Sequence, residues 1–177
     1  MSRTTPEPGA MNEMETEERI HPVRFREMVI AGRFRWERAI ERVPADRWDD
    51  PTAPGNGTIK DLIAHIAWYE AQVVSLLLTR DFTRGSGLWF VEPDERNAAI
   101  YAERASWTLE RVVQEEHELF EALRPLLAEL DEVDLNESSQ FVGMPDDLVP
   151  WEIIAGNTFG HYDEHLPDLE YWLDRGI

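Results

Sequence analysis

The chain of 177 residues contains no cysteine. This absence excludes disulfide bonds, zinc–thiolate sites and a cysteine nucleophile. Basic residues are scarce, 17 against 36 acidic ones, and the formal net charge of −19 makes nucleic acid and anionic membranes poor partners. No apolar run approaches the roughly 18–20 residues that span a bilayer. The start of the chain lacks the apolar segment of a secretory signal, so we expect a cytoplasmic protein without membrane contact.

Apolar residues make up 42 % of the chain and aromatic residues 10 %. A chain of this length and composition is expected to fold as one domain around a single core. Residues 1–21 carry prolines, a glycine and several glutamates without apolar periodicity, so we predict a mobile acidic tail there. The folded domain is expected to cover residues 22–177.

Apolar residues recur at helical spacing in four stretches, at about residues 22–43, 58–79, 94–130 and from 150 onwards. None of these stretches shows the alternation of a β-strand. The connectors between them are longer than is usual in compact domains, so we expect at least one to carry function or to cross the bundle. The sequence therefore predicts an all-α protein, a four-helix bundle with a long crossover connection.

Local signals add detail to the predicted helices. Thr58, followed three residues later by Asp61, fits the capping box that begins a helix. Proline cannot donate a backbone hydrogen bond inside a helix. We therefore expect Pro125 to interrupt the last part of the third helix and Pro167 to bend the fourth.

Three of the five histidines stand at positions that suit a metal ion. His161 and His165 are four residues apart in GNTFGHYDEHLPDLEYWL, on the same helical stripe as Trp151 and Ile154. His65 lies on an apolar side of the second helix, in TIKDLIAHIAWYE. Burying imidazoles costs free energy unless each ring finds a partner, and a shared metal ion would supply one. We predict a metal site formed by these three histidines.

Three neutral imidazoles suit Zn²⁺ or Ni²⁺, with Fe²⁺, Co²⁺ or Mn²⁺ as alternatives that the sequence does not separate. Three protein ligands would leave one position open, as in catalytic rather than structural sites. Candidates to orient the histidine rings or to line a pocket are Asp61, Tyr69, Trp89, Asn157 and Thr158. The sequence contains no HExxH, GxSxG, P-loop or Rossmann glycine motif, so it identifies no catalytic side chain beyond the metal site.

The run TIKDLIAHIAWYE, a third helix that opens with NAAIYAE, the HYDEH run and the closing LEYWL resemble the DinB-like superfamily of four-helix bundles, and within it the ClbS/DfsB-type branch. The similarity covers most of residues 22–177. It implies an up-up-down-down type bundle with a long crossover, often dimeric, so we expect a homodimer. Many members bind a divalent metal through one histidine of the second helix and two residues of the fourth. The matching positions here are His65, His161 and His165.

Function differs widely among such relatives, so the fold does not decide it. The leading hypothesis is a metal-dependent hydrolase or thiol-dependent transferase that acts on a small electrophilic metabolite, in detoxification or self-protection. Because the chain has no cysteine, a low-molecular-weight thiol would enter as a cosubstrate. The alternative is a non-catalytic protein that sequesters a small molecule. A third hypothesis, that the histidines merely pack, predicts a protein hydrogen-bond partner for each ring nitrogen.

Overall fold

The computed structural model describes residues 19–51 and 57–175. Of the predicted acidic tail, residues 1–18 lie outside the described residues. Ile20, by contrast, is buried in the core, and its backbone N–H donates to Asn136 Oδ1 at 2.8 Å. The last residues before the first helix are therefore part of the folded body.

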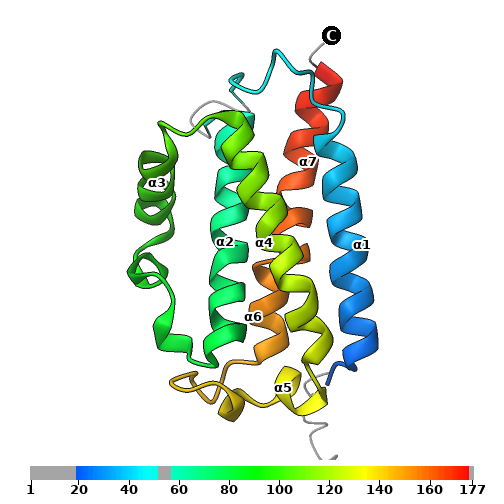
Figure 1. The fold of residues 1–177 in the computed structure, drawn as a ribbon, viewed down its shortest axis with the longest axis vertical. Coiled ribbons are helices and arrows are strands. Elements are labelled where there is room, and N and C mark those ends of the chain that lie inside the picture. Colours follow the sequence, from blue (N-terminus) through cyan, green and yellow to red (C-terminus); the bar gives the residue numbers. More distant parts are fainter. Residues whose placement is uncertain (1–18, 52–56, 176–177) are drawn as a thin grey trace, which may run out of the picture.

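Long helical segments that run along one axis form the bundle (Figure 1). They are α1 (Pro22–Ile40), α2 (Ile59–Thr79), α4 (Leu109–Glu129), and the consecutive pair α6 (Pro150–Gly156) and α7 (Phe159–Arg175). In Figure 1, α1 ascends, α2 and α4 descend, and α6 and α7 ascend again. The order is up-down-down-up, which corrects the up-up-down-down order that the resemblance implied, because the long connection follows the second helix and not the first.

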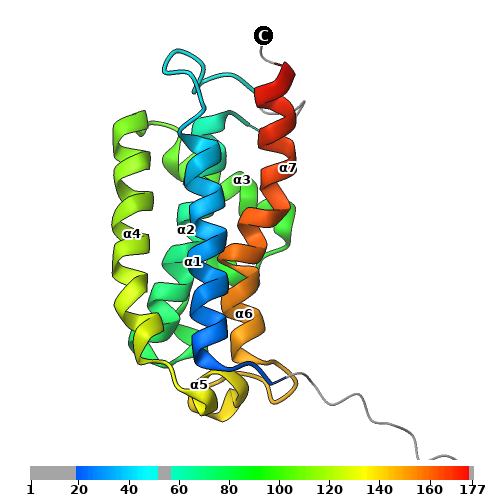
Figure 2. The ribbon, with the colours of Figure 1, turned by 90° about the vertical axis from the view of Figure 1, so that its right-hand side faces the viewer.

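The long crossover is the connection between α2 and α4, which returns the chain to the upper end so that these two helices run parallel (Figure 1). It contains two short 3₁₀ helices, η1 (Phe82–Arg84) and η2 (Gly87–Phe90), and the helix α3 (Pro93–Arg104). α3 packs on the outside of α2. Figure 2 shows α1 flanked by α4 on one side and by α6 and α7 on the other. The crossover therefore lies along α2, the helix that carries His65.

The capping box at the start of α2 is confirmed. Thr58 Oγ1 accepts the backbone N–H of Asp61 at 3.1 Å, and Asp61 Oδ2 accepts the backbone N–H of Thr58 at 3.0 Å. The reciprocal bonds satisfy two donors that a helix start otherwise leaves unpaired. This cap fixes where α2 begins, and with it the register of His65, about two turns further on.

The third predicted helix is two helices. It breaks at residues 105–108, where Thr108 accepts the backbone N–H of Arg111 at 3.3 Å and begins α4. The prediction that Pro125 interrupts the later part was wrong, since α4 continues through it to Glu129. Threonine is a favoured N-cap residue, so Thr108 marks the start of a new helix in the sequence. The apolar periodicity, which continues across the break, obscured this signal.

The fourth predicted helix also divides, into α6 and α7. Asn157 leaves the helical conformation (φ −113°, ψ 7°), and its side chain donates to the carbonyl of Ile153 at 2.6 Å. Thr158 Oγ1 donates in the same way to the carbonyl of Ile154 at 2.7 Å. Such side-chain bonds to the backbone four residues earlier compete with continuous helix. His161 consequently stands in the first turn of a new helix, and Pro167 lies within it.

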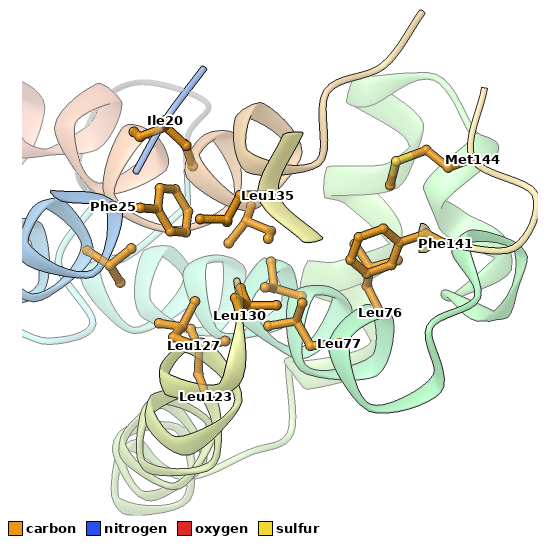
Figure 3. Close-up of a cluster of buried hydrophobic side chains, with 14 of the residues drawn as sticks. Ile20, Phe25, Leu76, Leu77, Leu123, Leu127, Leu130, Leu135, Phe141 and Met144 are labelled. Atoms are coloured by element: carbon orange, nitrogen blue, oxygen red, sulfur yellow. The ribbon is translucent and has the colours of Figure 1, made fainter. Parts of the chain in front are cut away.

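Two apolar clusters fill the bundle. The lower one joins the first half of α1 and the second halves of α2 and α4 to α5 (Glu132–Asn136) and the loop after it, as Figure 3 shows for Phe25, Leu76, Leu123 and Leu135. The upper one gathers around Trp36 and Tyr162, whose rings stack at 5.8 Å. By length and composition alone α2 could cross a membrane, yet 61 % of that window is buried inside the protein, as expected for the central helix of a bundle.

Candidate metal centre

The three predicted ligands meet inside the bundle. His65 projects from α2 and His161 and His165 from α7, and one potential ligand atom from each lies within 4.8 Å of the other two. His161 Nε2 is 3.0 Å from His65 Nε2 and 3.1 Å from His165 Nε2. Two nitrogens bound to one tetrahedral ion at about 2.0–2.1 Å stand about 3.3 Å apart, so both separations are close to those of a shared metal. The predicted trio is therefore one cluster in space.

Burial keeps these rings in the form that binds metals. His65 and His161 are buried, and His165 is half-buried. Loss of solvation, reinforced by the neighbouring histidines, lowers the pKa of His65 to about 3 and that of His161 to about 2. Desolvation also lowers the pKa of His165. All three imidazoles are thus neutral at physiological pH, with lone pairs available for a cation.

Hydrogen bonding within the protein does not account for the cluster. His161 Nε2 faces two other Nε2 atoms, but a neutral imidazole nitrogen offers either one proton or one lone pair, so it can complete only one of the two contacts. In addition, Nδ1 of His65 and Nδ1 of His161 are buried without a hydrogen-bond partner among the described residues. The hypothesis of histidines that merely pack required protein partners for these atoms, and the structure supplies none in its described part.

The residues predicted to orient the rings form hydrogen bonds elsewhere. Asp61 closes the capping box, and the side chains of Asn157 and Thr158 bond to carbonyls of α6. Tyr69 does contact the cluster, through its ring, which lies 4.4 Å from the His161 ring and 4.8 Å from the His65 ring between centroids. Trp89 packs on Tyr69 at 6.3 Å. Among the described residues, what the structure places against the histidine rings is aromatic packing.

A narrow pocket lies beside this aromatic group. Its lining is largely apolar and comes from α2, the 81–89 segment and α6; it includes Val73, Leu76, Phe82, Trp89 and Asn157. Two of the predicted pocket residues, Trp89 and Asn157, therefore do line a pocket. Trp89 of this pocket also contacts Tyr69, and Tyr69 contacts the His161 ring, so one intervening residue connects the pocket to the histidine cluster.

A buried charged layer fixes the helices around the cluster. Arg33 of α1 donates to Glu116 of α4 at 2.7 Å and to Glu70 of α2 at 3.3 Å. Tyr162 of α7 donates a short hydrogen bond to Glu70, and Trp36 Nε1 donates to Glu116 at 3.0 Å. Burial raises the pKa of the Glu70 carboxyl. The layer joins α1, α2, α4 and α7, and its member from α7, Tyr162, directly follows His161. It therefore holds α2 and α7 in the register at which the histidines meet.

Two further residues lie near the cluster that the sequence had not indicated as site residues. Tyr101 of α3 lies 6.2 Å from the His65 ring between centroids, and Arg96 donates to Tyr69 Oη at 3.3 Å. A signal for Arg96 exists, since Arg96, Ile100 and Arg104 follow one another at steps of four, which places them on one helix face. Ile100 is fully buried, so this face of α3 points inward.

Comparisons with known proteins agree with this architecture. The family signature described as the DinB superfamily matches residues 30–167, well over half of the chain. An uncharacterised protein from Escherichia coli UTI89 has a similar structure, with TM-score 0.75 and 13 % identity over 88 % of this chain and 94 % of that one. A Streptococcus pneumoniae protein also has TM-score 0.75, with 10 % identity over 91 % and 94 % of the two chains.

The structure described as Sibling Lethal Factor Precursor, DfsB, has TM-score 0.71 and 15 % identity over 90 % of this chain and 98 % of that one. At these identities the solved structures show a shared fold and nothing finer. No curated protein matched at the level that the comparison required. The helical architecture and the family signature together show that the chain belongs to the DinB superfamily.

Proposed function

We propose that the protein binds a divalent cation through Nε2 of His65, His161 and His165 and is a metal-dependent enzyme that acts on a small electrophilic molecule. The observation that supports this most directly is the convergence of the three nitrogens, with separations of 3.0 and 3.1 Å from the central one. The donor set fits, because three neutral imidazoles suit Zn²⁺ or Ni²⁺, with Fe²⁺, Co²⁺ or Mn²⁺ as alternatives. Three protein ligands leave a coordination position for a substrate or cosubstrate.

A cation at this position would supply Lewis acidity, which favours the deprotonated form of water or of a thiol near neutral pH. The chain's own residues would provide the setting. Tyr69 covers the two buried rings and limits access of bulk water, and the pocket beside Trp89 offers an apolar wall for the substrate. The reaction class that we propose is hydrolysis, or transfer of a thiol cosubstrate, on a small electrophile, with detoxification or self-protection as the role.

Metal analysis tests the first half of this proposal. We expect about one equivalent of metal in the wild-type protein, loss of that metal in His161→Ala, and retention in His117→Ala, since His117 is exposed on α4. A ligand present at 100 times its Kd stabilises the folded state by about 2.7 kcal/mol. For a chain of this size that corresponds to a melting temperature about 5–10 °C higher, which a chelator should remove.

Substoichiometric metal in the wild type, together with a melting temperature that a chelator leaves unchanged, would refute the metal site. Turnover then separates an enzyme from a sequestering protein. A screen of thiols against small electrophiles should yield product in excess of protein, with His161→Ala inactive and His117→Ala active. Stoichiometric binding without turnover would instead support sequestration in the pocket that Trp89 lines.

A further inference from the structure

Arg96 occupies an aromatic setting next to the histidine cluster. It projects inward from α3, and its guanidinium carbon lies 5.8 Å from the centre of the Tyr69 ring and 5.6 Å from that of Trp89. Tyr69 in turn packs on His65 and His161. One aromatic residue therefore links the guanidinium to the proposed metal ligands.

The charge of this guanidinium has no counter-ion among the described residues. Its Nη1 donates to Tyr69 Oη at 3.3 Å and its Nη2 to the carbonyl of Val91 at 3.0 Å, both neutral acceptors. Its Nε is buried and has no acceptor in the described part of the chain. Arg104, on the same face of α3, is paired with both Glu103 and Glu115. Arg96 is therefore a half-buried cation that no carboxylate of residues 19–51 or 57–175 pairs with.

The positive charge also acts on the histidine site. Arg96 is linked to the His65 and His161 rings through Tyr69. A guanidinium near the cluster disfavours a metal cation bound there. An anionic group bound between them would offset both positive charges. The arrangement is therefore electrostatically incomplete without a negative charge.

We propose that Arg96 binds an anionic oxygen group, a carboxylate or a phosphate, on the substrate or thiol cosubstrate whose reactive end reaches the histidine centre. This inference rests on the proposed function. Guanidinium is suited to the task because its planar fork of donors matches carboxylate and phosphate oxygens, and the Tyr69 and Trp89 rings hold its plane. The Tyr69 hydroxyl accepts from Arg96, which leaves its own proton free to donate to the same ligand.

A pair of thiols that differ only in charge tests the proposal. The full-length protein is loaded with Co²⁺, whose thiolate absorption reports binding, and is titrated with 3-mercaptopropionate and with its neutral amide. A charge-assisted contact of this kind is expected to favour the acid about tenfold or more. In Arg96→Met the preference should disappear, and in Arg96→Lys it should fall to an intermediate value, because the charge remains but the fork is lost.

Arg111→Met is the matched control, because Arg111 also stacks on an aromatic ring, that of Trp107 at 3.8 Å, but is exposed and lies on α4. It should keep the full preference for the acid. Equal affinity of the wild type for the acid and the amide, or an undiminished preference in Arg96→Met, would overturn the proposal while leaving the metal site intact.

If the protein takes up no Co²⁺, the proposed function fails. A second measurement then tests the anion site at Arg96 by itself. The Nε–H resonance of Arg96 in the metal-free protein is followed by NMR during titration with propionate, inorganic phosphate and propionamide. A saturable shift with propionate or phosphate and none with the amide would support the anion site and identify its preferred oxygen group. No saturable shift with either anion would overturn it.

Discussion

The buried charged layer offers a direct test of what holds the site together. Arg33 is only 3 % exposed, and it is the cation that pairs with both Glu70 and Glu116. Replacing it by methionine keeps most of the volume and removes the charge. Glu116 is then left as a buried carboxylate whose remaining donor is Trp36 Nε1. The variant Arg33→Met therefore isolates the electrostatic part of the interaction.

The expected loss follows from burial. Removing one partner of a buried ion pair typically costs about 3–5 kcal/mol, because the other charge stays out of water without compensation. Glu70 adds less to this loss, since burial raises the pKa of its carboxyl and favours the protonated form. The stability of a domain is about 5–15 kcal/mol, so the variant should still fold and remain measurable.

Urea unfolding of the wild type and of Arg33→Met measures the loss of unfolding free energy. The two proteins should show the same dependence of this free energy on urea concentration. Glu37→Gln is the control, because Glu37 accepts from the same arginine at 2.8 Å but has 45 % of its side chain exposed. An exposed partner contributes about 0–1 kcal/mol, so the control should stay within that range. Metal affinity measured in parallel should fall in Arg33→Met, because Tyr162, bonded to Glu70, neighbours His161.

A loss below about 1 kcal/mol in Arg33→Met would refute the assignment of this layer as a charge-paired structural element.

Two further perturbations address packing and protonation at the cluster. In Gly32→Ala the added Cβ would clash with Phe159 Cβ, so we expect a loss of about 1–3 kcal/mol of stability and weaker metal binding. Gly156→Ala, with open space around the added Cβ, should leave both unchanged. In the metal-free protein, His161 has a pKa of about 2 when folded and an ordinary value when unfolded, so below pH 6.5 the unfolded state binds the extra proton and stability falls with acidification. Urea titrations at pH 6.0 and 4.5 should show wild type losing about 2 kcal/mol more than His161→Phe, and parallel losses would contradict the shift.

The sequence predicts the cluster because its determinants are local. The i, i+4 spacing of His161 and His165 survives in any helix, and the capping box at Thr58 fixes the register of His65. Apolar periodicity predicts the bundle, but it does not reveal breaks, because apolar residues keep steps of three and four across residues 105–108. The Arg33–Glu70–Glu116 layer joins residues 37 and 83 positions apart, so it becomes visible only once the helix order is known.

The break between α6 and α7 explains why the polar neighbours of His161 do not orient its ring. A chain that leaves the helix at Asn157 exposes carbonyls of the preceding turn, and the amide of Asn157 and the hydroxyl of Thr158 bond to them. Those side chains are thereby used in shaping the backbone. The orientation of His161 then depends on the Tyr69 ring at 4.4 Å and on the layer that holds the adjacent Tyr162. The site is consequently positioned by contacts from other helices, and those contacts, unlike the histidine spacing, cannot be read along one helix.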